Sequence, residues 1–549
     1  MSGPPSARLA LAQTVALSLT VGGLCAEFQS PQALAPDPPA SPASVPLVIE
    51  DVSVIGMDAD GVTDHRTVVV SAGRVQAIGD RTTPHPAGAV VIPGRGRYLL
   101  PALIDMHAHV RAADLSAYPT AGITTVRNMW GWPELPALIA RVERGEIRGP
   151  RIISASQGLD GEPVQWPATR LVRNPAQAVA AVREQGQAGW RYLKVYTSLS
   201  RESYAAILDE AAALGIPVIG HVPVAVPIEE ALARGQRSIE HLTGYDRRVS
   251  RSGRAGTWAW ADADPAGYRA LAEATQRAGA WNCPTLAIYV ALSRQHSPAE
   301  QRAIVEQRRR FVRELHRAGA LLLAGSDAGI GVVPPGQSLH DELAELVASG
   351  LTPYEALRAA TVDAGRFLQV EQLGTVAAGA PADLLLVAGN PLDDLTRLRR
   401  FDGLIHRGAW IPAGAEPAPT SGDASAPGVI QVGGTYSTAV TLGDNTCGSV
   451  TVQPLPTTVQ HSAGATTFSL AHGPLTYQGT LETTGAFTTA PRSVSGGGET
   501  STLRIVGQFT VTGFTATVTV DVERPGSPLP CRYLVAWVGT KQGDPNIIP

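Results

Sequence analysis

The sequence predicts an α/β protein that contains a (β/α)8 TIM barrel, a β-sandwich built from the segments on either side of the barrel, and a separate C-terminal all-β domain. Three patterns predict this class. Short apolar runs alternate with helical patterns through residues 99–368, as in parallel βα units. Short β-branched runs flank this interior at 46–98 and 369–410. From residue 428 onward, Thr, Val and aromatic residues alternate between Gly-rich turns.

Residues 1–26 have the pattern of a signal peptide. Arg8 makes the start positive, an apolar core follows, and the small residues around Ala26 offer a cleavage site. Leu24 is bulkier than the residue that usually precedes a lipid-modified cysteine, which argues against a lipid anchor at Cys25. The sequence therefore predicts an exported protein, periplasmic or extracellular, with no transmembrane span in the mature chain.

Two linkers separate the predicted domains. Residues 27–45 and 411–427 are rich in Pro, Ala and Ser and have no means of burying a core. The strand-like runs at 46–98 and 369–410 lie between these linkers and flank one long interior. A single β-sandwich domain assembled from both flanks is therefore expected.

Eight candidate strands and the helices between them make up the interior. The helical segments 201–215 and 227–235 end on Gly215 and Gly235, as helix C-caps do. Eight βα units within 99–368 fit a TIM barrel, whose chemistry lies at the carboxyl ends of its strands. The candidate strands are 99–109, 122–129, 150–156, 191–196, 216–221, 237–241, 279–286 and 320–327.

Residues 428–549 form the predicted all-β domain, which is a sandwich or a small barrel. Cys447 and Cys531 both fall in this segment, whereas Cys283 stands alone in the interior. In an oxidising compartment, Cys447 and Cys531 are expected to form a disulfide. Closing a loop of about 85 residues contributes about 4 kcal/mol in the chain-entropy model.

The composition excludes one class of partner. Hydrophobic residues make up 44% of the chain, charged residues 17%, and the net charge is −4, which is typical of an ordinary globular protein. The sequence contains no basic block that could follow a phosphate backbone. Nucleic acid is therefore not expected as a partner.

Side chains that can bind a metal recur at the predicted strand ends. His107 and His109 are two residues apart on the first strand, so both point to one face at the barrel mouth and can hold one ion. A common position at one rim is typical of a metal centre rather than of scattered polar residues. The other candidates end the fourth, fifth, sixth and eighth strands, and they are Lys194, His221, His241 and Asp327.

Lys194 is one of only two lysines in the chain, beside 42 arginines. Where only a positive charge is needed, arginine serves equally well. A lysine retained in an apolar strand flanked by tyrosines therefore suggests chemistry that a guanidinium cannot perform, the alternative being chance or a snorkelling stem.

The order and spacing of these residues resemble the metal-dependent amidohydrolase superfamily. The resemblance covers about residues 46–410 and is closest to the imidazolonepropionase-like branch, which includes Xaa-Pro dipeptidases, carnosine-type dipeptidases and ochratoxin-hydrolysing amidases. The matching motifs are HAH at 107–109, LKVY around Lys194, GHVP at His221, IEHL at His241, GSDAG at Asp327, GITTVRNM, SLHDELAELVASGLTPYEALRAATVDAGRFL and LGTVAAGAPADLLLV.

The resemblance implies two divalent metal ions bridged by N6-carboxylysine at Lys194. A neutral lysine amine takes up CO2 to give a carbamate with two anionic oxygens, whereas arginine stays protonated and cannot. Zinc suits this imidazole-rich set, although manganese, cobalt or nickel also fit it. The implied ligands are His107, His109 and Asp327 for one ion and His221 and His241 for the other.

A mechanism follows from this implied centre. Two divalent ions lower the pKa of a bridging water to about 7 and polarise the scissile carbonyl. Asp327 is expected to carry a proton to the leaving amine, and Tyr196 to donate to the developing oxyanion, unless Tyr196 only packs. Arg127 and His340 are candidate substrate contacts. The alternatives are a structural ion pair for Arg127 and a helix N-terminal polar role for His340.

Two features depart from the branch. Asn128 stands where the branch has an acid after TTVR, and residues 111–121 leave little room for a long first βα loop. Both features bear on the substrate pocket rather than on the metal ligands.

The leading hypothesis is an exported binuclear amidohydrolase that cleaves an amide (C–N) bond with a metal-activated hydroxide. The expected substrate is a dipeptide, such as Xaa-Pro, or an N-acyl amino acid. One alternative is a cyclic-amide or lactone hydrolase. A deaminase is less favoured, because mononuclear deaminases of the superfamily do not need the fourth-strand lysine. A non-enzymatic alternative is a surface adhesion or glycan-binding protein that acts through 428–549. A homo-oligomer and contact with the cell surface stay open.

Overall fold

The computed structural model describes residues 45–166, 168–414, 430–448, 450–462, 464–482, 484–496, 498–524, 531–542 and 546–548. The predicted signal peptide, the first linker up to residue 44 and residues 415–427 of the second linker lie outside the described residues. The chain divides into two compact units, residues 1–418 and 419–549. Within the described residues, no helix is both long and apolar enough to cross a membrane.

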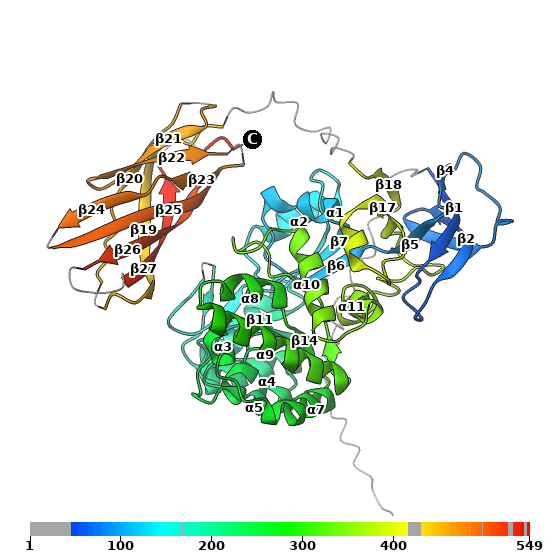
Figure 1. The fold of residues 1–549 in the computed structure, drawn as a ribbon, viewed down its shortest axis with the longest axis horizontal. Helices are drawn as coiled ribbons and strands as arrows, with labels where there is room; N and C mark the ends of the chain where they lie inside the picture. The colour runs from blue at the N-terminus through cyan, green and yellow to red at the C-terminus, as the bar shows by residue number, and fades with distance from the viewer. Residues whose placement is uncertain are drawn as a thin grey trace, which may run out of the picture. The chain divides into compact units, whose positions relative to one another are not determined.

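Parallel strands surrounded by helices form the centre of the first unit (Figure 1). These strands are β6 (Leu103–Ala108), β7 (Ile123–Asn128), β8 (Arg151–Ser154), β9 (Gly158–Asp160), β10 (Arg170–Leu171), β11 (Leu193–Val195), β12 (Val218–Gly220), β13 (Ser238–Glu240), β14 (Trp281–Cys283) and β15 (Leu321–Leu322). Strands β6 to β8 pair in one sheet, and β9 and β11 to β15 pair in sequence order in another. The N–H of Ser156 donates to Tyr192 O (2.8 Å), and Ala108 bridges Ala328, so the ring closes into a TIM-barrel-like domain.

Helix α4 (Arg201–Leu214) shows how the sequence sets the covering helices. Ser200 caps its start by accepting from the N–H of Ser203, and Gly215 ends it at φ +68°, as the sequence predicts. The other helices are α1 (Ala117–Thr120), α2 (Leu135–Glu143), α3 (Pro175–Gln187), α5 (Ile228–Ala233), α6 (Tyr245–Val249), α7 (Tyr268–Ala278), α8 (Leu286–Ser293), α9 (Pro298–Arg317), α10 (Gln337–Ala348), α11 (Pro353–Ala359) and α12 (Val362–Leu368). Short 3-10 turns are η1 (Ala112–Asp114), η2 (Thr257–Trp260), η3 (Pro265–Gly267) and η4 (Leu395–Arg399).

A mixed sheet joins the two flanks of the barrel segment. Its strands are β1 (Leu47–Val54), β2 (Thr63–Ser71), β3 (Arg74–Gly79), β4 (Val90–Pro93), β5 (Arg97–Pro101), β16 (Leu384–Ala388), β17 (Phe401–His406) and β18 (Ala409–Pro412). The order is β18-β17-β16-β5-β1-β2-β3, with β4 on β1. The sequence predicts a sandwich, but these eight strands pair within one sheet. Register shifts in β1 let its first half pair with β4 and its last residues with β5.

The first predicted strand, 99–109, divides between the two sheets. Residues 97–101 pair with β16 in the mixed sheet, and 103–108 enter the barrel. The change of partner occurs at Ala102, whose N–H donates to Asp383 O, while the next N–H, on Leu103, donates to Gly122 O (2.9 Å each). The sequence pattern did not reveal this boundary, because the apolar run continues through it.

The second unit is a closed antiparallel barrel. Its strands are β19 (Gly434–Asn445), β20 (Thr457–Gln460), β21 (Thr467–His472), β22 (Leu475–Leu481), β23 (Ala486–Thr489), β24 (Arg492–Gly496), β25 (Glu499–Thr510), β26 (Gly513–Glu523) and β27 (Cys531–Lys541). The order β23-β22-β21-β20-β19-β27-β26-β25 closes through a β23–β25 pairing, and β24 lies outside the ring. Of the two predicted architectures, the structure has the small barrel.

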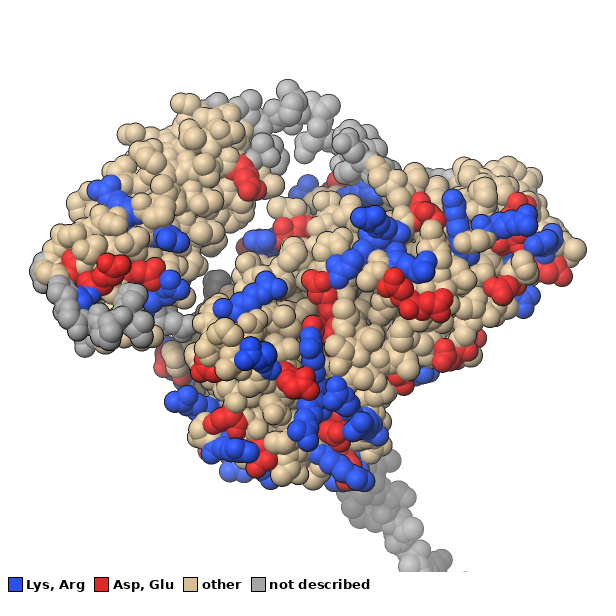
Figure 2. Space-filling model, viewed as in Figure 1, with Lys and Arg blue, Asp and Glu red and all other residues tan. Residues whose placement is uncertain are grey.

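Cys447 and Cys531 form the predicted disulfide, with an S–S distance of 2.09 Å. Figure 2 shows basic and acidic side chains interspersed over the visible face of the first unit.

Candidate metal centre

The barrel brings the predicted metal-binding side chains to one rim. His107 lies on β6 and His109 directly after it, Lys194 lies on β11, and His221, His241 and Asp327 each follow the end of a later strand. Nε2 of His107 and Nε2 of His109 lie 3.2 Å and 3.1 Å from Oδ1 of Asp327. The ring centroids of His221 and His241 are 4.9 Å apart, and those of His107 and His241 are 4.5 Å apart. Sequence positions up to 220 residues apart therefore converge on one small volume.

Two backbone features allow this approach. His241 and Asp327 adopt positive φ values of 61° and 55°, a conformation that costs non-glycine residues free energy and is often found at functional sites. Gly220 comes close to β11, because a Cβ on Gly220 would lie 2.2 Å from Val195 O and 2.9 Å from Cδ of Lys194. A larger residue at Gly220 would push β12 away from Lys194 on β11.

The donor set fits a metal ion. Nε2 of His107 and Oδ1 of Asp327 are buried, and neither has a hydrogen-bond partner among the described residues. Single ligand atoms of His107, His109 and Asp327 all lie within 4.8 Å of one another. Buried nitrogen and oxygen atoms left without partners are costly, and a divalent cation between them removes that cost.

The electrostatics favour the forms that bind metals. Burial lowers the pKa of His109, and burial together with nearby positive groups lowers the pKa values of His221 and His241 well below the usual value. Burial raises the pKa of Asp327, but His241 and His107 outweigh burial and hold it well below its usual value. The imidazoles are therefore neutral and the carboxylate is charged near neutral pH.

Lys194 is buried in the barrel with 1% of its surface exposed. Burial lowers its pKa to about 8, against the opposing attraction of Glu240 and Asp327. Its Nζ makes no hydrogen bond or ion pair with any described residue, and it lies 5.9 Å from the centroid of the Tyr196 ring. An amine in this setting has an appreciable neutral fraction at mildly alkaline pH.

Glu240 is a residue of the candidate metal centre that the sequence interpretation missed. Its Oε2 lies 2.8 Å from Nδ1 of His107, and its two oxygens accept from Nη2 of Arg127 at 3.0 Å and 3.1 Å. Burial alone would raise the pKa of Glu240. Arg127 and His107 outweigh burial and hold the pKa below its usual value, so Glu240 is a carboxylate. Because a carboxylate only accepts, Nδ1 of His107 donates to Glu240, and this hydrogen bond turns Nε2 toward Asp327. The signal was a glutamate inside the apolar strand RSIEH, where a charge needs a partner.

The structure places Arg127 and His340 away from the expected substrate contacts. Arg127 is fully buried beneath the metal-binding side chains, where its guanidinium also donates to Met106 O and to Oγ of Ser238. His340 is on α10, and its Nε2 lies 2.9 Å from Ala121 O. For Arg127, the alternative of a structural ion pair describes the observed contacts.

Tyr196 borders the metal-binding cluster. Its ring centroid lies 4.1 Å from that of His221, and Trp130 contacts the ring edge-on at 5.2 Å. The phenol oxygen accepts a hydrogen bond from Nε1 of Trp166 at 2.6 Å. Because indole N–H is only a donor, the phenol keeps its own proton for another acceptor, and burial raises the pKa of Tyr196, which keeps it protonated.

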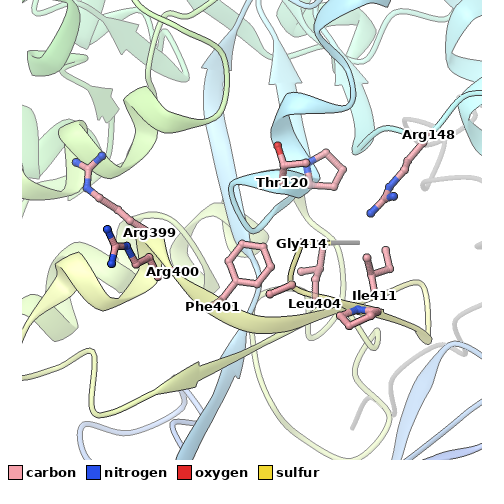
Figure 3. Close-up of a pocket in the computed structure, with 11 residues that line it drawn as sticks. Thr120, Arg148, Arg399, Arg400, Phe401, Leu404, Ile411 and Gly414 are labelled. Carbon is pink, nitrogen blue, oxygen red and sulfur yellow. The ribbon is translucent and has the colours of Figure 1, made fainter. Parts of the chain in front are cut away.

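A cavity of about 140 Å³ opens onto this cluster. It is lined by His109, Trp130, Trp166, Lys194, Tyr196, His221, His241, Tyr289, Leu292, Asp327 and Ile330. A larger cavity of about 550 Å³ lies elsewhere in the first unit, where Arg148, Arg399 and Arg400 surround an apolar floor that includes Phe401 and Leu404 (Figure 3). The larger cavity has no carboxylate or imidazole in its lining, so the smaller one is the candidate active site.

Comparisons with known proteins agree with this geometry. The model of the Amidohydrolase family matches residues 98–411. A curated relative, the 5-methylthioadenosine/S-adenosylhomocysteine deaminase of Symbiobacterium thermophilum, is 25% identical over 395 residues, which are 62% of this chain and 85% of that protein.

Two solved structures resemble the first unit. A candidate prolidase from Bifidobacterium longum has a TM-score of 0.56 and 25% identity, covering 70% of this chain and 96% of that one. The bottromycin amidohydrolase has a TM-score of 0.56 and 27% identity, covering 67% of this chain and 87% of that one.

Proposed function

Because the chain belongs to the amidohydrolase family, we propose that it is a binuclear metallohydrolase that cleaves the amide bond of a dipeptide or an N-acyl amino acid. The family establishes that the protein is a hydrolase acting on carbon–nitrogen bonds. The substrate, the two-ion centre and the carboxylated lysine are the proposed refinements.

One observation carries the proposal. Nε2 of His107 and Oδ1 of Asp327 are buried without hydrogen-bond partners among the described residues and lie 3.2 Å apart, and the buried Lys194 lines the same cavity as Asp327. In the proposed centre, His107, His109 and Asp327 hold one ion, His221 and His241 hold the other, and the carbamate of Lys194 joins them. Zinc is the expected metal. When bound, the ions supply an activated water as nucleophile and polarise the scissile carbonyl.

The residues of this chain perform the remaining steps. Asp327 lies at the centre of the cluster with a charged carboxylate, so it accepts a proton from the attacking water and returns it to the leaving nitrogen. Tyr196 keeps its phenol proton because Trp166 is the donor in their hydrogen bond, and that proton stabilises the developing oxyanion. Glu240 holds His107 in the tautomer that presents Nε2.

Export is part of the proposal. The disulfide between Cys447 and Cys531 supports an oxidising compartment, as does the signal-peptide pattern of the first 26 residues.

The chain offers a matched pair of lysines for the test. The protein is purified with bicarbonate present, and bound metal is measured by elemental analysis in wild type, Lys194→Ala, Lys194→Arg and Lys541→Arg. We expect about two ions per chain in wild type and Lys541→Arg, and one or none in both Lys194 variants. A ¹³C carbamate signal from labelled bicarbonate should disappear only in the Lys194 variants. Equal metal content in all four proteins would refute the bridging role.

A substrate screen separates the reaction classes. Hydrolysis of dipeptides and N-acyl amino acids supports the proposal, whereas ammonia release from aminopurine nucleosides would assign the chain to the deaminase chemistry of its curated relative. Cyclic amides and lactones are included, because the same residues can attack a ring carbonyl.

A further inference from the structure

The candidate active site continues outward into a second cavity. The outer cavity measures about 180 Å³ and is lined by His109, Val110, Arg111, Asn128, Trp130, Trp132, Trp166, Gly329 and Ile330. It shares His109, Trp130, Trp166 and Ile330 with the inner cavity of about 140 Å³. A substrate that reaches the metal-binding cluster from the outer cavity therefore passes between Trp130, Trp166 and Ile330.

Aromatic rings form the walls of this passage. Trp130 and Trp132 follow β7, and Trp166 follows β9. Trp130 packs edge-on against Tyr196, and Trp166 is held by its hydrogen bond to the Tyr196 oxygen. On the α8 side, Tyr289 is held by Arg308, whose guanidinium lies 3.5 Å from the ring centroid. Contacts within the protein therefore orient the rings of Trp130, Trp166 and Tyr289, which lowers the entropy cost of stacking a flat group among them.

The same walls offer almost no charge to a substrate. Asp327 is the only carboxylate among the lining residues, and it belongs to the metal-binding cluster. Asn128 is neutral and fully used, because it accepts from the N–H of Val110 and donates to Trp130 O and Oγ of Ser154. Arg111 is paired with Asp114 at 2.6 Å. Ring faces therefore make up most of the surface that the passage offers to a substrate.

We propose that the passage selects amides that carry a flat aromatic group beside the scissile bond. This inference rests on the proposed function and refines it. The indole faces supply stacking and apolar burial for that group.

Matched substrates test the preference. Hydrolysis by the full-length protein is measured with N-benzoylalanine against N-acetylalanine and with acetanilide against N-methylacetamide. We expect kcat/KM at least about tenfold higher for the aromatic member of one pair or both. Equal values within both pairs would overturn the inference.

Tryptophan variants locate the preference. In Trp130→Leu and Trp166→Leu the aromatic-to-aliphatic ratio of kcat/KM should fall to about one third or less of its wild-type value, and Trp130→Phe should keep most of it. Trp258→Leu is the control, because Trp258 is 48% exposed and lines neither cavity. An unchanged ratio in both leucine variants would place the selectivity elsewhere and refute the assignment.

A binding measurement separates this inference from the proposed function. Isothermal titration calorimetry measures the affinity for benzamide and for acetamide in wild type, Trp130→Leu and Trp258→Leu. Tighter benzamide binding that is lost only in Trp130→Leu supports the aromatic passage even when no amide is cleaved, and in that case the proposed reaction fails alone. Amide cleavage with no benzamide preference means that the aromatic passage fails alone.

Discussion

Glu240 shows how one buried carboxylate can orient a histidine of the candidate metal centre. Its oxygens hold Arg127 and Nδ1 of His107, and all three side chains are buried. The charge of Glu240 is balanced by Arg127, so the carboxylate tolerates burial. The hydrogen bond fixes both the tautomer and the ring orientation of His107.

We expect Glu240→Gln to bind metal about 10- to 100-fold more weakly, because an amide can donate to Nδ1 and stabilise the tautomer that turns Nε2 into a donor. The metal dissociation constant is measured by competition with a chromophoric chelator. Glu345→Gln is the matched control, since Glu345 is also held by an arginine, Arg309, but lies outside the site. Equal affinities in both variants would contradict this role for Glu240.

At the scale of elements, helix α10 caps the start of helix α8. Thr285, the N-cap residue of α8, has φ 48° and no side-chain hydrogen bond to the helix. The side chain of Glu342 on α10 supplies the missing cap, because its Oε2 accepts from the N–H of Ala287 at 2.8 Å. The carboxyl is fully buried, and burial raises its pKa from 4.5 to about 8 despite the backbone hydrogen bonds.

The raised pKa of Glu342 predicts a pH-dependent stability. Between pH 4.5 and about 8 the folded protein holds a proton that the unfolded chain has lost. The stabilising contribution is therefore complete below pH 4.5 and is lost as the pH rises through about 8. We expect Glu342→Gln to remove a few kcal/mol of the decline in unfolding free energy between pH 5 and 8, since one pKa unit corresponds to about 1.4 kcal/mol.

Urea unfolding of wild type, Glu342→Gln and Asp341→Asn at several pH values measures this effect. Asp341 is the adjacent carboxylate, and its side chain is 56% exposed, so its variant should follow the wild-type curve. A decline of the same size in Glu342→Gln would show that Glu342 does not keep its proton in the fold.

At the scale of the whole molecule, the chemistry belongs to the first unit. Among the described residues, two groups of side chains could hold a metal, and both lie in the barrel of that unit: His107 with His109 and Asp327, and His107 with Glu240 and Cys283. The second unit has its own apolar core of Phe, Tyr and Val side chains and its own disulfide. The two units are therefore expected to respond independently to chemical change.

Removal of the disulfide tests this independence. We expect Cys531→Ala to lower the free energy of unfolding of the second unit by about 4 kcal/mol, because the cross-link restricts a long loop in the unfolded chain. Metal content and amide hydrolysis should not change. In calorimetry, a reductant should shift the unfolding temperature of one transition in wild type and of no transition in Cys531→Ala. Loss of metal on reduction would instead show that the two units are coupled.

The sequence by itself determined the barrel and the candidate metal ligands that gather at its rim. Alternation places His107 and His109 on one face. Parallel strands bring Lys194 on β11 and the residues that follow β12, β13 and β15 to one rim. These rules are local, so they can be followed along the chain. The disulfide was also predictable, because the C-terminal segment holds only two cysteines.

Only the tertiary structure decided which side chains meet across distant segments. Glu240 pairs with Arg127 and His107, more than 110 residues earlier in the chain, and Ala102 changes sheets because its N–H reaches Asp383 O. The tryptophan passage likewise joins loops after different strands. A polar group that is buried loses its hydrogen bonds to water and needs a partner within the fold. Local sequence patterns do not show which distant residue supplies that partner.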